Sequence, residues 1–551
     1  MKTFGSAKAV LAIALLGVIA LALACAGKEA PTAVPTATPT TSPAATPTQA
    51  SRPTSPTAAS TSTTSAPAVV KPLYGGTLRQ AINLSMKSLD PFHNVDWREQ
   101  QVEFLIYDSL VRADSNFNVI PDLARSWDYS ADGKSITFRL VQGAKFHDGS
   151  EFNADVVQKN FAKLLDPAWN STTRADFAPA VDNVKVVDSS TVVINLKQAW
   201  RPFISNMTSA KFGMISIASQ EKYGDNYPRN PSGTGPFKLK EWAPGDRIIL
   251  VKNDSYREAG KPYLDSIVFL NVPDASVQLA MLRTGDAELV DEVLATSLPL
   301  LQNNPKIKVM PFQTRNWWSM LFKVDTDPFT NKALRQAVAY ALDRQKIVDV
   351  YLAGQGSPAY ANGASWYNDP SYEPYKYDAQ KAKTKLAEAG FPNGVTIPYW
   401  CDAADVEQRL CELVQSILSN VNIKADIITV PSSDYYTNIN TAKTKFGKMA
   451  YFPRPDPDYV MRSTLHSTGF RTKVLGYKNA EVDKLVDDAA ATYDTAKAGQ
   501  MYVQAQKIVF DEAVYTGLYY PKTFAAMSSK VQNFQWWLDT LLRLKDVWIE
   551  K

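Results

Sequence analysis

The stretch Asn331-Lys-Ala-Leu-Arg-Gln-Ala-Val-Ala-Tyr-Ala-Leu-Asp-Arg344 carries apolar residues with the period of an α-helix. Its residues Leu334, Val338, Ala341 and Leu342 lie on one face of that helix. The helical pattern continues to Leu352, and Ala353-Gly354 supplies a glycine for the position after the last turn. We therefore predict a single helix over 331–352.

Helical and strand-like segments alternate on both sides of this stretch. Further helices are predicted at 154–165, 379–389, 406–418 and 479–491. Strands with β-branched or alternating residues are predicted at 75–82, 136–140, 191–196 and 395–401. No repeat with a period of 20–50 residues occurs, which disfavours a solenoid or a propeller. The pattern predicts an α/β fold.

Composition narrows the classes of protein. The 551 residues are 45% hydrophobic and 21% charged, which is enough apolar material for a large core and for more than one domain. Lys and Arg number 59 against 55 Asp and Glu, and this balance gives no support to nucleic-acid binding. Only three histidines and three cysteines are present, so multi-histidine metal centres and four-cysteine zinc sites are disfavoured. No cofactor and no metal are expected.

The first 24 residues are typical of a signal peptide. Lys2 and Lys8 precede the apolar run Val10–Ala24, which is too short for an ordinary membrane-spanning helix. The run ends in Leu21-Ala-Leu-Ala-Cys25, which resembles a bacterial lipobox, although Ala22 stands where a leucine is usual. We predict cleavage before Cys25 and lipidation of its thiol. An ordinary cleavage site with an incidental cysteine and an uncleaved anchor are the alternatives.

Residues 25–71 combine this cysteine with a segment dominated by Pro, Thr, Ser and Ala. Such a composition cannot bury enough apolar surface to offset the entropy of ordering, so we predict an extended tether. At roughly 3 Å per residue it would hold the folded domain, residues 72–551, some tens of ångströms from the membrane. A mucin-like glycosylated stalk is the other interpretation.

The cysteines Cys401 and Cys411 remain as an even pair once Cys25 carries lipid, as suits an oxidising compartment. Cys401 ends a predicted strand, and Cys411 lies about two turns into the next predicted helix. A bridge needs Cα atoms within about 7 Å, so the chain would have to fold back along the helix after Ala403. A disulfide and two buried free thiols both remain open.

Nine short motifs follow one another between Gly75 and Gly390. They are Gly75-Gly-Thr-Leu, Ser88-Leu-Asp-Pro-Phe, Ile106-Tyr-Asp-Ser-Leu-Val, Pro121-Asp-Leu-Ala-Arg-Ser-Trp, Phe146-His-Asp-Gly-Ser-Glu-Phe-Asn-Ala-Asp-Val-Val, Gly233-Thr-Gly-Pro-Phe-Lys-Leu, Leu282-Arg-Thr-Gly-Asp-Ala-Glu, the stretch 331–344, and Tyr377-Asp-Ala-Gln-Lys-Ala-Lys-Thr-Lys-Leu-Ala-Glu-Ala-Gly390. In this order they make residues 73–551 resemble family 5 of the bacterial extracellular solute-binding proteins. That family comprises the peptide, nickel and opine receptors of ABC importers.

The resemblance implies a two-lobed fold like that of periplasmic binding proteins, with an extra subdomain inserted in lobe 1. Lobe 1 would comprise 72–111, 199–312 and 515–551, the inserted subdomain 112–198, and lobe 2 313–514. The two lobes would close over a ligand by a hinge motion.

The resemblance also implies a function. It predicts an exported, lipid-anchored and monomeric receptor, not an enzyme, in the periplasm or on the outer face of the cytoplasmic membrane. The receptor would capture oligopeptides or another small organic solute and deliver it to an ABC permease of two membrane subunits plus ATPases.

Two other classes of function are the alternatives. One is a ligand sensor that docks onto a signalling receptor, and the other is a secreted hydrolase. The sequence contains neither Gly-x-Ser-x-Gly nor His-Glu-x-x-His, which disfavours the hydrolase, although paired carboxylates remain open.

Aromatic residues at the family's cleft positions are candidate ligand contacts. The run Arg315-Asn316-Trp317-Trp318 falls where the family's chain enters lobe 2, and strand alternation allows only one of the two tryptophans to line the cleft. Family position adds Trp97, Trp400 and Tyr520. Core packing is the alternative for each of these aromatic residues.

The run Tyr451-Phe-Pro-Arg-Pro-Asp-Pro-Asp-Tyr459 departs from the pattern of peptide-binding relatives. In those relatives an aspartate three residues before an acidic-Pro pair grips the ligand's α-amino group. Aligning that pair with Asp456-Pro457 puts Pro453 at the gripping position, and Arg454 and Arg315 would instead favour a carboxylate.

Two alternatives to this anion site remain open. Arg454 pairs with Asp456 or Asp458 in one of them. In the other, a small shift of the alignment brings Asp456 into the amine site. Calcium binding by Asp456 and Asp458 alone is disfavoured, because six to eight oxygens are needed.

Two further motifs resemble catalytic or phosphate-binding sequences only superficially. Phe146-His147-Asp148-Gly149 is interpreted as a turn, because Asp-Gly is a turn signal and adjacency does not place Asp148 on the imidazole. Gly233-Thr-Gly-Pro lacks the Lys-Ser/Thr of a phosphate loop and precedes a strand-like segment.

Overall fold

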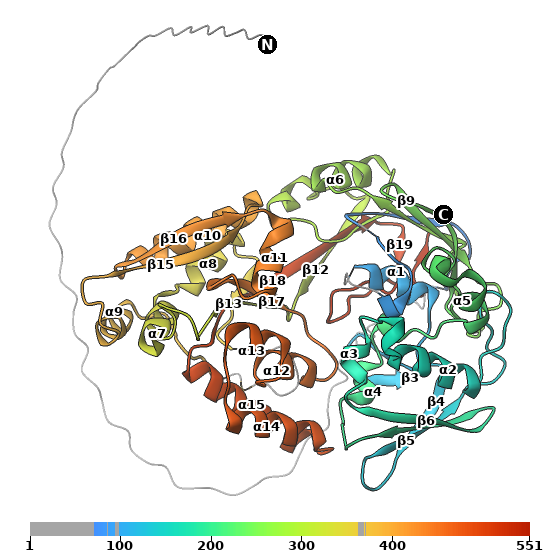
Figure 1. The fold of residues 1–551 in the computed structure, drawn as a ribbon. Coiled ribbons are helices and arrows are strands. Elements are labelled where there is room, and N and C mark those ends of the chain that lie inside the picture. Colours follow the sequence, from blue (N-terminus) through green and yellow to red (C-terminus); the bar gives the residue numbers. More distant parts are fainter. Residues whose placement is uncertain (1–70, 85, 94–97, 362–368, 370) are drawn as a thin grey trace, which may run out of the picture. The chain divides into compact units, whose positions relative to one another are not determined.

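A long mixed sheet runs through the computed structural model (Figure 1). Its main path follows the order β16-β15-β17-β13-β18-β11-β1-β10-β9-β8, while β12 and β14 pair with β18 beside this path. The strands are β1 (Thr77–Ile82), β8 (Phe237–Ala243), β9 (Arg247–Lys252), β10 (Ser266–Asn271), β11 (Leu289–Val290), β12 (Ile307–Gln313), β13 (Trp317–Phe322), β14 (Gly356–Pro358), β15 (Val395–Asp402), β16 (Ile423–Val430), β17 (Phe446–Tyr451) and β18 (Tyr515–Ser528).

The structure describes residues 71–84, 86–93, 98–361, 369 and 371–551. The predicted signal peptide, the lipidation site Cys25, nearly all of the tether and the candidate contact Trp97 lie outside the described residues. In the part of the chain that is described, no helix is both long and apolar enough to cross a membrane.

Strand β18 joins the two halves of the sheet. Its first residues pair with β13, where Leu321 faces Tyr515, and its last residues pair with β12, where Ile307 faces Ser528. We call the half with β1 and β8–β12 the first lobe, and the half with β13–β17 the second lobe. The two lobes therefore share β18, and the chain also crosses between them from β12 to β13 through residues 314–316.

A separate four-stranded sheet with the order β4-β5-β7-β6 lies beside the first lobe. Phe138 and Ile194 of this sheet belong to the same apolar core as Leu78 and Ile267 of the first lobe. The strands are β4 (Ala124–Tyr129), β5 (Ser135–Leu140), β6 (Val181–Asp188) and β7 (Thr191–Leu196), and short pairs are formed by β2 (Val111–Ala113) with β3 (Val119–Pro121) and by β19 (Val531–Gln532) with β20 (Trp548–Ile549).

The helices of the first lobe and its neighbouring sheet are short. Asn153 caps α2, where its side chain accepts a hydrogen bond from the Val156 amide at 3.1 Å. These helices are α1 (Glu99–Ile106), α2 (Ala154–Leu165), α3 (Arg174–Phe177), α4 (Phe203–Asn206), α5 (Ile217–Tyr223) and α6 (Ala275–Thr284).

Helices cover both faces of the second lobe's sheet. Side chains alternate along β13, so Met320 and Phe322 pack into one core, whereas Trp317 and Leu321 pack into another. The first core is covered by α7 (Lys332–Ala341), α8 (Arg344–Tyr351), α9 (Ala379–Glu388) and α10 (Asp405–Ser419), and the second by α11 (Ser432–Asn440), α12 (Asp458–Thr464), α13 (Phe470–Leu475), α14 (Ala480–Ala491) and α15 (Thr495–Asp511).

The prediction of one helix over 331–352 is wrong, because the structure has two helices there. The chain leaves the helical conformation at Leu342 and Asp343, and the Asp343 carboxylate accepts a hydrogen bond from the Lys346 amide at 3.0 Å. Asp343 therefore caps the start of α8. The apolar period continues across the break, so periodicity alone does not show it.

Cys401 at the end of β15 and Cys411 in α10 are joined by a disulfide, with Cα atoms 6.2 Å apart. The chain turns back after Ala403, whose amide donates to the Val430 carbonyl at 2.9 Å. The bridge fastens this turn, because it ties α10 to the strand on which the helix packs.

Gly233 and Gly235 allow two backbone segments to lie in direct contact. A Cβ atom on Gly233 would stand 2.2 Å from the Ile106 carbonyl oxygen, and one on Gly235 would stand 2.6 Å from the Leu105 carbonyl oxygen. The Gly235 amide donates to the Ile106 carbonyl at 2.9 Å. This motif therefore joins the end of α1 to the strand β8.

Candidate functional site

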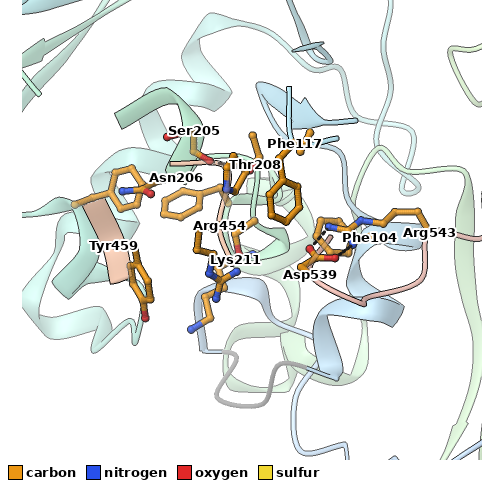
Figure 2. A pocket seen from close by; sticks show the side chains of 15 residues that line it. Phe104, Phe117, Ser205, Asn206, Thr208, Lys211, Arg454, Tyr459, Asp539 and Arg543 are labelled. Atoms are coloured by element: carbon orange, nitrogen blue, oxygen red, sulfur yellow. Dashed lines mark hydrogen bonds and ion pairs between the residues drawn. The ribbon is translucent and has the colours of Figure 1, made fainter. Parts of the chain in front are cut away.

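A cavity of about 40 Å³ lies where residues of the two lobes meet (Figure 2). The first lobe contributes Phe104 of α1 and Lys211, while Asp539 and Arg543 come from the segment that follows β19. Residues 454, 455 and 459 come from the second lobe, at the start of α12. The cavity is therefore lined by segments more than 300 residues apart in the sequence.

The charged groups at this cavity are predominantly basic. Asp539 accepts two hydrogen bonds of 2.6 Å from the guanidinium of Arg543, which also lies 4.0 Å from the centre of the Phe104 ring. The guanidinium of Arg454 lies 5.3 Å from the centre of the Tyr459 ring and forms no ion pair with any described residue. The one acidic lining residue is thus paired with Arg543, and Arg454 has no carboxylate partner among the described residues.

Figure 2 shows how these groups are arranged around the cavity. Arg454 and Lys211 extend toward the same side, whereas the dashed lines join Asp539 to Arg543. Such an arrangement can bind a carboxylate through charge-assisted hydrogen bonds.

A second and larger cavity of about 230 Å³ lies in the first lobe. It shares the lining residues Phe104, Ala113, Thr208 and Arg543 with the first cavity. The two cavities are thus neighbours.

The second cavity is lined by charges of both signs. Arg257 forms ion pairs with Asp108, at 3.3 Å, and with Asp122. Burial has the largest effect on Asp122 and the charge of the nearby Asp108 the next largest. Together they raise the pKa of Asp122 to about 7, although the charge of Arg257 opposes this shift. Lys545 on the same wall pairs with Glu258 at 2.9 Å. The second cavity is therefore polar, and these acidic and basic groups form ion pairs with residues of the protein itself.

The aromatic candidates lie on different faces of the second lobe. Trp317 is buried in a core, where its ring stacks on Tyr451 with ring centres 5.4 Å apart. Trp318 points to the opposite face, stacks on Tyr519 and has the Lys448 ammonium 4.2 Å from its ring centre. Neither tryptophan lines the cavity beside Arg454.

The remaining candidates from the region between the lobes also lie away from that cavity. Trp400 packs partly buried against the second lobe's core, and the hydroxyl of Tyr520 donates to the Ala361 carbonyl at 2.7 Å. Asn316 is buried and Arg315 is exposed in the crossing segment 314–316. Of the described candidate contacts, Arg454 is the one that lines the cavity between the lobes.

Asp456 and Asp458 are buried behind the cavity and are paired with basic residues other than Arg454. Arg201 forms an ion pair with Asp456, and Arg462 forms one with Asp458 at 3.3 Å. Burial raises the pKa of Asp456 to about 6, and the charge of Arg201 opposes this shift. The alternative in which Arg454 pairs with Asp456 or Asp458 does not occur in this structure.

Sequence reasoning missed most of the residues that line the cavity. Phe104, Lys211, Asp539 and Arg543 belong to no motif, and only the folding of distant segments brings them to Arg454. Tyr459 could have been found, because it follows Arg454 closely in the run Tyr451–Tyr459 and is aromatic like the other candidate contacts.

Comparison with known proteins finds a matching family model and similar proteins that bind solutes. Residues 118–472 match the family model described as bacterial extracellular solute-binding proteins, family 5 middle. The chain is 30% identical over 481 residues to the glutathione-binding protein GsiB of Escherichia coli O1:K1. This alignment covers 85% of this chain and 93% of GsiB.

Solved structures share the fold. The periplasmic binding protein DppA of Helicobacter pylori, in complex with the peptide STSA, superposes with a TM-score of 0.79 at 24% identity, covering 87% of this chain and 99% of DppA. The oligopeptide-binding protein AppA of Bacillus subtilis, in complex with a nonapeptide, superposes with a TM-score of 0.76 at 25% identity, covering 87% of this chain and all 100% of AppA.

Proposed function

The chain belongs to family 5 of the bacterial extracellular solute-binding proteins, and from this premise we propose that it captures a solute bearing a carboxylate between its lobes. Members of this family are the substrate-binding receptors of ABC importers, so the chain is a receptor and not an enzyme. Its fold is the two-lobed α/β fold of the periplasmic peptide-binding proteins.

Arg454 is the observation that carries the proposed ligand class. Its guanidinium lines the cavity between the lobes and has no carboxylate partner among the described residues. If Asp456-Pro457 aligns with the acidic-Pro pair of the peptide-binding relatives, Pro453 replaces the aspartate that grips the amine there, and Arg454 brings a positive charge beside it. A peptide or small organic acid would place a carboxylate on Arg454 and its remaining groups toward the larger cavity.

The proposal includes the setting of the receptor. Lipidation of Cys25 and the tether of residues 25–71 would anchor a monomer to the outer face of the cytoplasmic membrane. From there it would pass its solute to the two membrane subunits of the permease. We further propose the divisions given by the resemblance, with lobe 1 at 72–111, 199–312 and 515–551, the insertion at 112–198, and lobe 2 at 313–514.

The ligand class is tested by native mass spectrometry followed by calorimetry. The mass of a co-purified solute identifies its class, and titration with glutathione tests an acidic tripeptide that the relative GsiB is named for. We expect glutathione to bind more tightly than the amide of tri-alanine, which has no carboxylate. Arg454→Ala should weaken glutathione binding roughly 10- to 100-fold, and Arg454→Lys less, since lysine keeps the charge but loses the fork.

The matched control is Arg247→Ala, which removes an exposed guanidinium of the first lobe paired with Glu241 and Asp246. Its affinity for glutathione should equal that of the unchanged chain. Equal binding of tri-alanine amide, together with unchanged affinity in Arg454→Ala, would overturn the anion proposal and favour an amine grip by another residue.

A further inference from the structure

An ion pair crosses from the β7–α4 connection to the second lobe. Arg201 follows β7 and pairs with Asp456, which is 255 residues away in the sequence. A second hydrogen bond joins Arg201 Nη2 to Asp456 Oδ1 at 3.3 Å. The two side chains are 9% and 5% exposed, so both charges are withdrawn from water at this contact.

The neighbouring residues extend the same contact. The indole N–H of Trp200 donates to Asp458 at 3.3 Å, and the amide of Arg201 donates to the Ala490 carbonyl of the second lobe at 2.9 Å. The Asp458 amide in turn donates to the Asp456 carboxylate at 2.9 Å. The pair is therefore part of a small network that joins residues 200–201 to residues 456–458.

The same segment of the second lobe carries both the network and the cavity wall. Arg454 and Tyr459 face the cavity, whereas Asp456 and Asp458, which lie between them in the sequence, face away from it and bind residues 200–201 and α12. Fixing Asp456 therefore fixes the backbone from which Arg454 projects.

A buried ion pair sets geometry more reliably than it adds stability. Removing two charges from water is unfavourable, and their attraction offsets this cost only when the groups meet in one arrangement. If one partner is lost, the other remains as a buried charge without compensation. The pair thus favours one relative placement of the two segments over nearby alternatives.

We infer that Arg201 is a positioning residue, whose pair with Asp456 holds residues 453–459 against residues 200–201 and so aims Arg454 into the cavity. This inference rests on the proposed function, because it assigns Arg201 a role in the ligand site. It adds a residue that lines neither of the two cavities described above and belongs to none of the motifs.

Hydrogen exchange of the full chain tests the contact without any ligand. In Arg201→Ala, amides in residues 199–206 and in 456–464 should exchange at least fivefold faster than in the unchanged chain. Arg201→Lys should restore part of the protection, because it keeps the charge. Asp456→Asn should raise exchange in both segments, as it removes the charge from the other side while keeping the shape.

Arg462→Ala is the matched control, because Arg462 lies in α12 and pairs with Asp458 within the second lobe. It should speed exchange in 456–464 and leave 199–206 unchanged. Exchange at unchanged rates in both segments of Arg201→Ala would overturn the inference. So would faster exchange spread over the whole chain, since Arg201 would then be needed for folding in general.

Glutathione titration separates this inference from the proposed ligand class. If Arg201 positions Arg454, Arg201→Ala should weaken glutathione binding about tenfold, mainly through faster dissociation, and Arg201→Lys should recover part of the loss. If glutathione does not bind the unchanged chain, the exchange experiment still decides the contact, and only the ligand class fails. Full glutathione affinity in Arg201→Ala would refute the positioning role.

Discussion

Arg344 is fully buried in the second lobe and has no carboxylate partner in the described structure. Its guanidinium donates to the carbonyl oxygens of Gly517 and Tyr375, each at 2.7 Å, and to the Thr516 hydroxyl at 2.6 Å. Burial lowers the pKa of Arg344 to about 10, which leaves it charged at neutral pH. One side chain therefore satisfies acceptors from several separate segments.

We predict that Arg344→Met lowers the free energy of unfolding by about 3–5 kcal/mol, because several buried carbonyl groups lose their donor. Equilibrium urea unfolding measures the change. Arg247→Met, at an exposed ion pair, should lower the free energy of unfolding by less than about 1 kcal/mol and serves as the control. A loss of less than about 1 kcal/mol in Arg344→Met would contradict this account of the buried guanidinium.

His147 gives the stability of the protein a pH dependence. Its Nε2 lies 3.0 Å from the Gly235 carbonyl, which can only accept, and its buried Nδ1 has no partner in the described structure. Burial lowers the pKa of His147 to about 4, below its ordinary value of 6.5. The folded chain therefore holds this imidazole neutral where the unfolded chain binds a proton.

As pH falls from about 6.5 to about 4, the unfolded chain gains a proton at His147 before the folded chain does, so acidification favours unfolding. This group alone should lower the free energy of unfolding by up to about 3 kcal/mol across that window. We predict that His147→Gln unfolds with a shallower pH dependence between pH 7 and pH 4. Parallel curves for the two proteins would show that His147 does not carry this effect.

At the residue scale, the sequence indicated Arg454 but not the residues around it. Arg454 was a candidate because it stands next to an acidic-Pro pair, and the structure places it in the wall of a cavity; its contact with a ligand stays a prediction. The burial of Arg344 could not be predicted, because arginine is usually exposed and its acceptors lie up to 173 residues away. Contacts of such separation are set by the tertiary fold and leave no local pattern.

At the scale of elements, the segments with a clear local pattern were predicted well: the helices predicted at 379–389, 406–418 and 479–491 overlap α9, α10 and α14. The prediction of 154–165 coincides with α2, where Asn153 caps the first turn and the buried residues recur at helical spacing. The break between α7 and α8 was missed, because an aspartate can also stand inside a helix. Only the structure shows that the Asp343 side chain caps the start of α8. Boundaries fixed by a side-chain hydrogen bond are the ones that periodicity cannot supply.

The disulfide between β15 and α10 should stabilise this part of the second lobe. In the chain-entropy account, closing a loop of this length contributes about 2–3 kcal/mol by restricting the unfolded chain. We predict that replacing both Cys401 and Cys411 by alanine lowers the free energy of unfolding by that amount in urea. Addition of a reductant should destabilise the unchanged chain similarly and leave the double variant unaffected; equal stability with and without reductant in both proteins would exclude the bridge.

At the scale of the whole molecule, β18 belongs to both lobes, and the second crossing is the short segment 314–316. Thr314 ties these two crossings together, since its hydroxyl donates to the Pro521 carbonyl at 2.7 Å. If the lobes move by a hinge, the chain would bend in β18 and in the adjacent segment 314–316. The sequence predicts strands in both lobes. Which strands pair with one another depends on residues far apart in the chain, so local patterns do not determine it.

The cellular location of the protein depends on its first 71 residues. If Cys25 is lipidated, acyl chains bind the membrane with about 0.8 kcal/mol for each buried CH₂ group, so the full chain should partition into detergent micelles. The mass of the unchanged chain should then correspond to a protein that begins at Cys25 and carries acyl chains, and replacement of Cys401 and Cys411 should change neither this partitioning nor these acyl chains. If the unchanged chain carries no acyl chain and keeps residues 1–24 by mass, the apolar run Val10–Ala24 is an uncleaved anchor and lipidation is refuted.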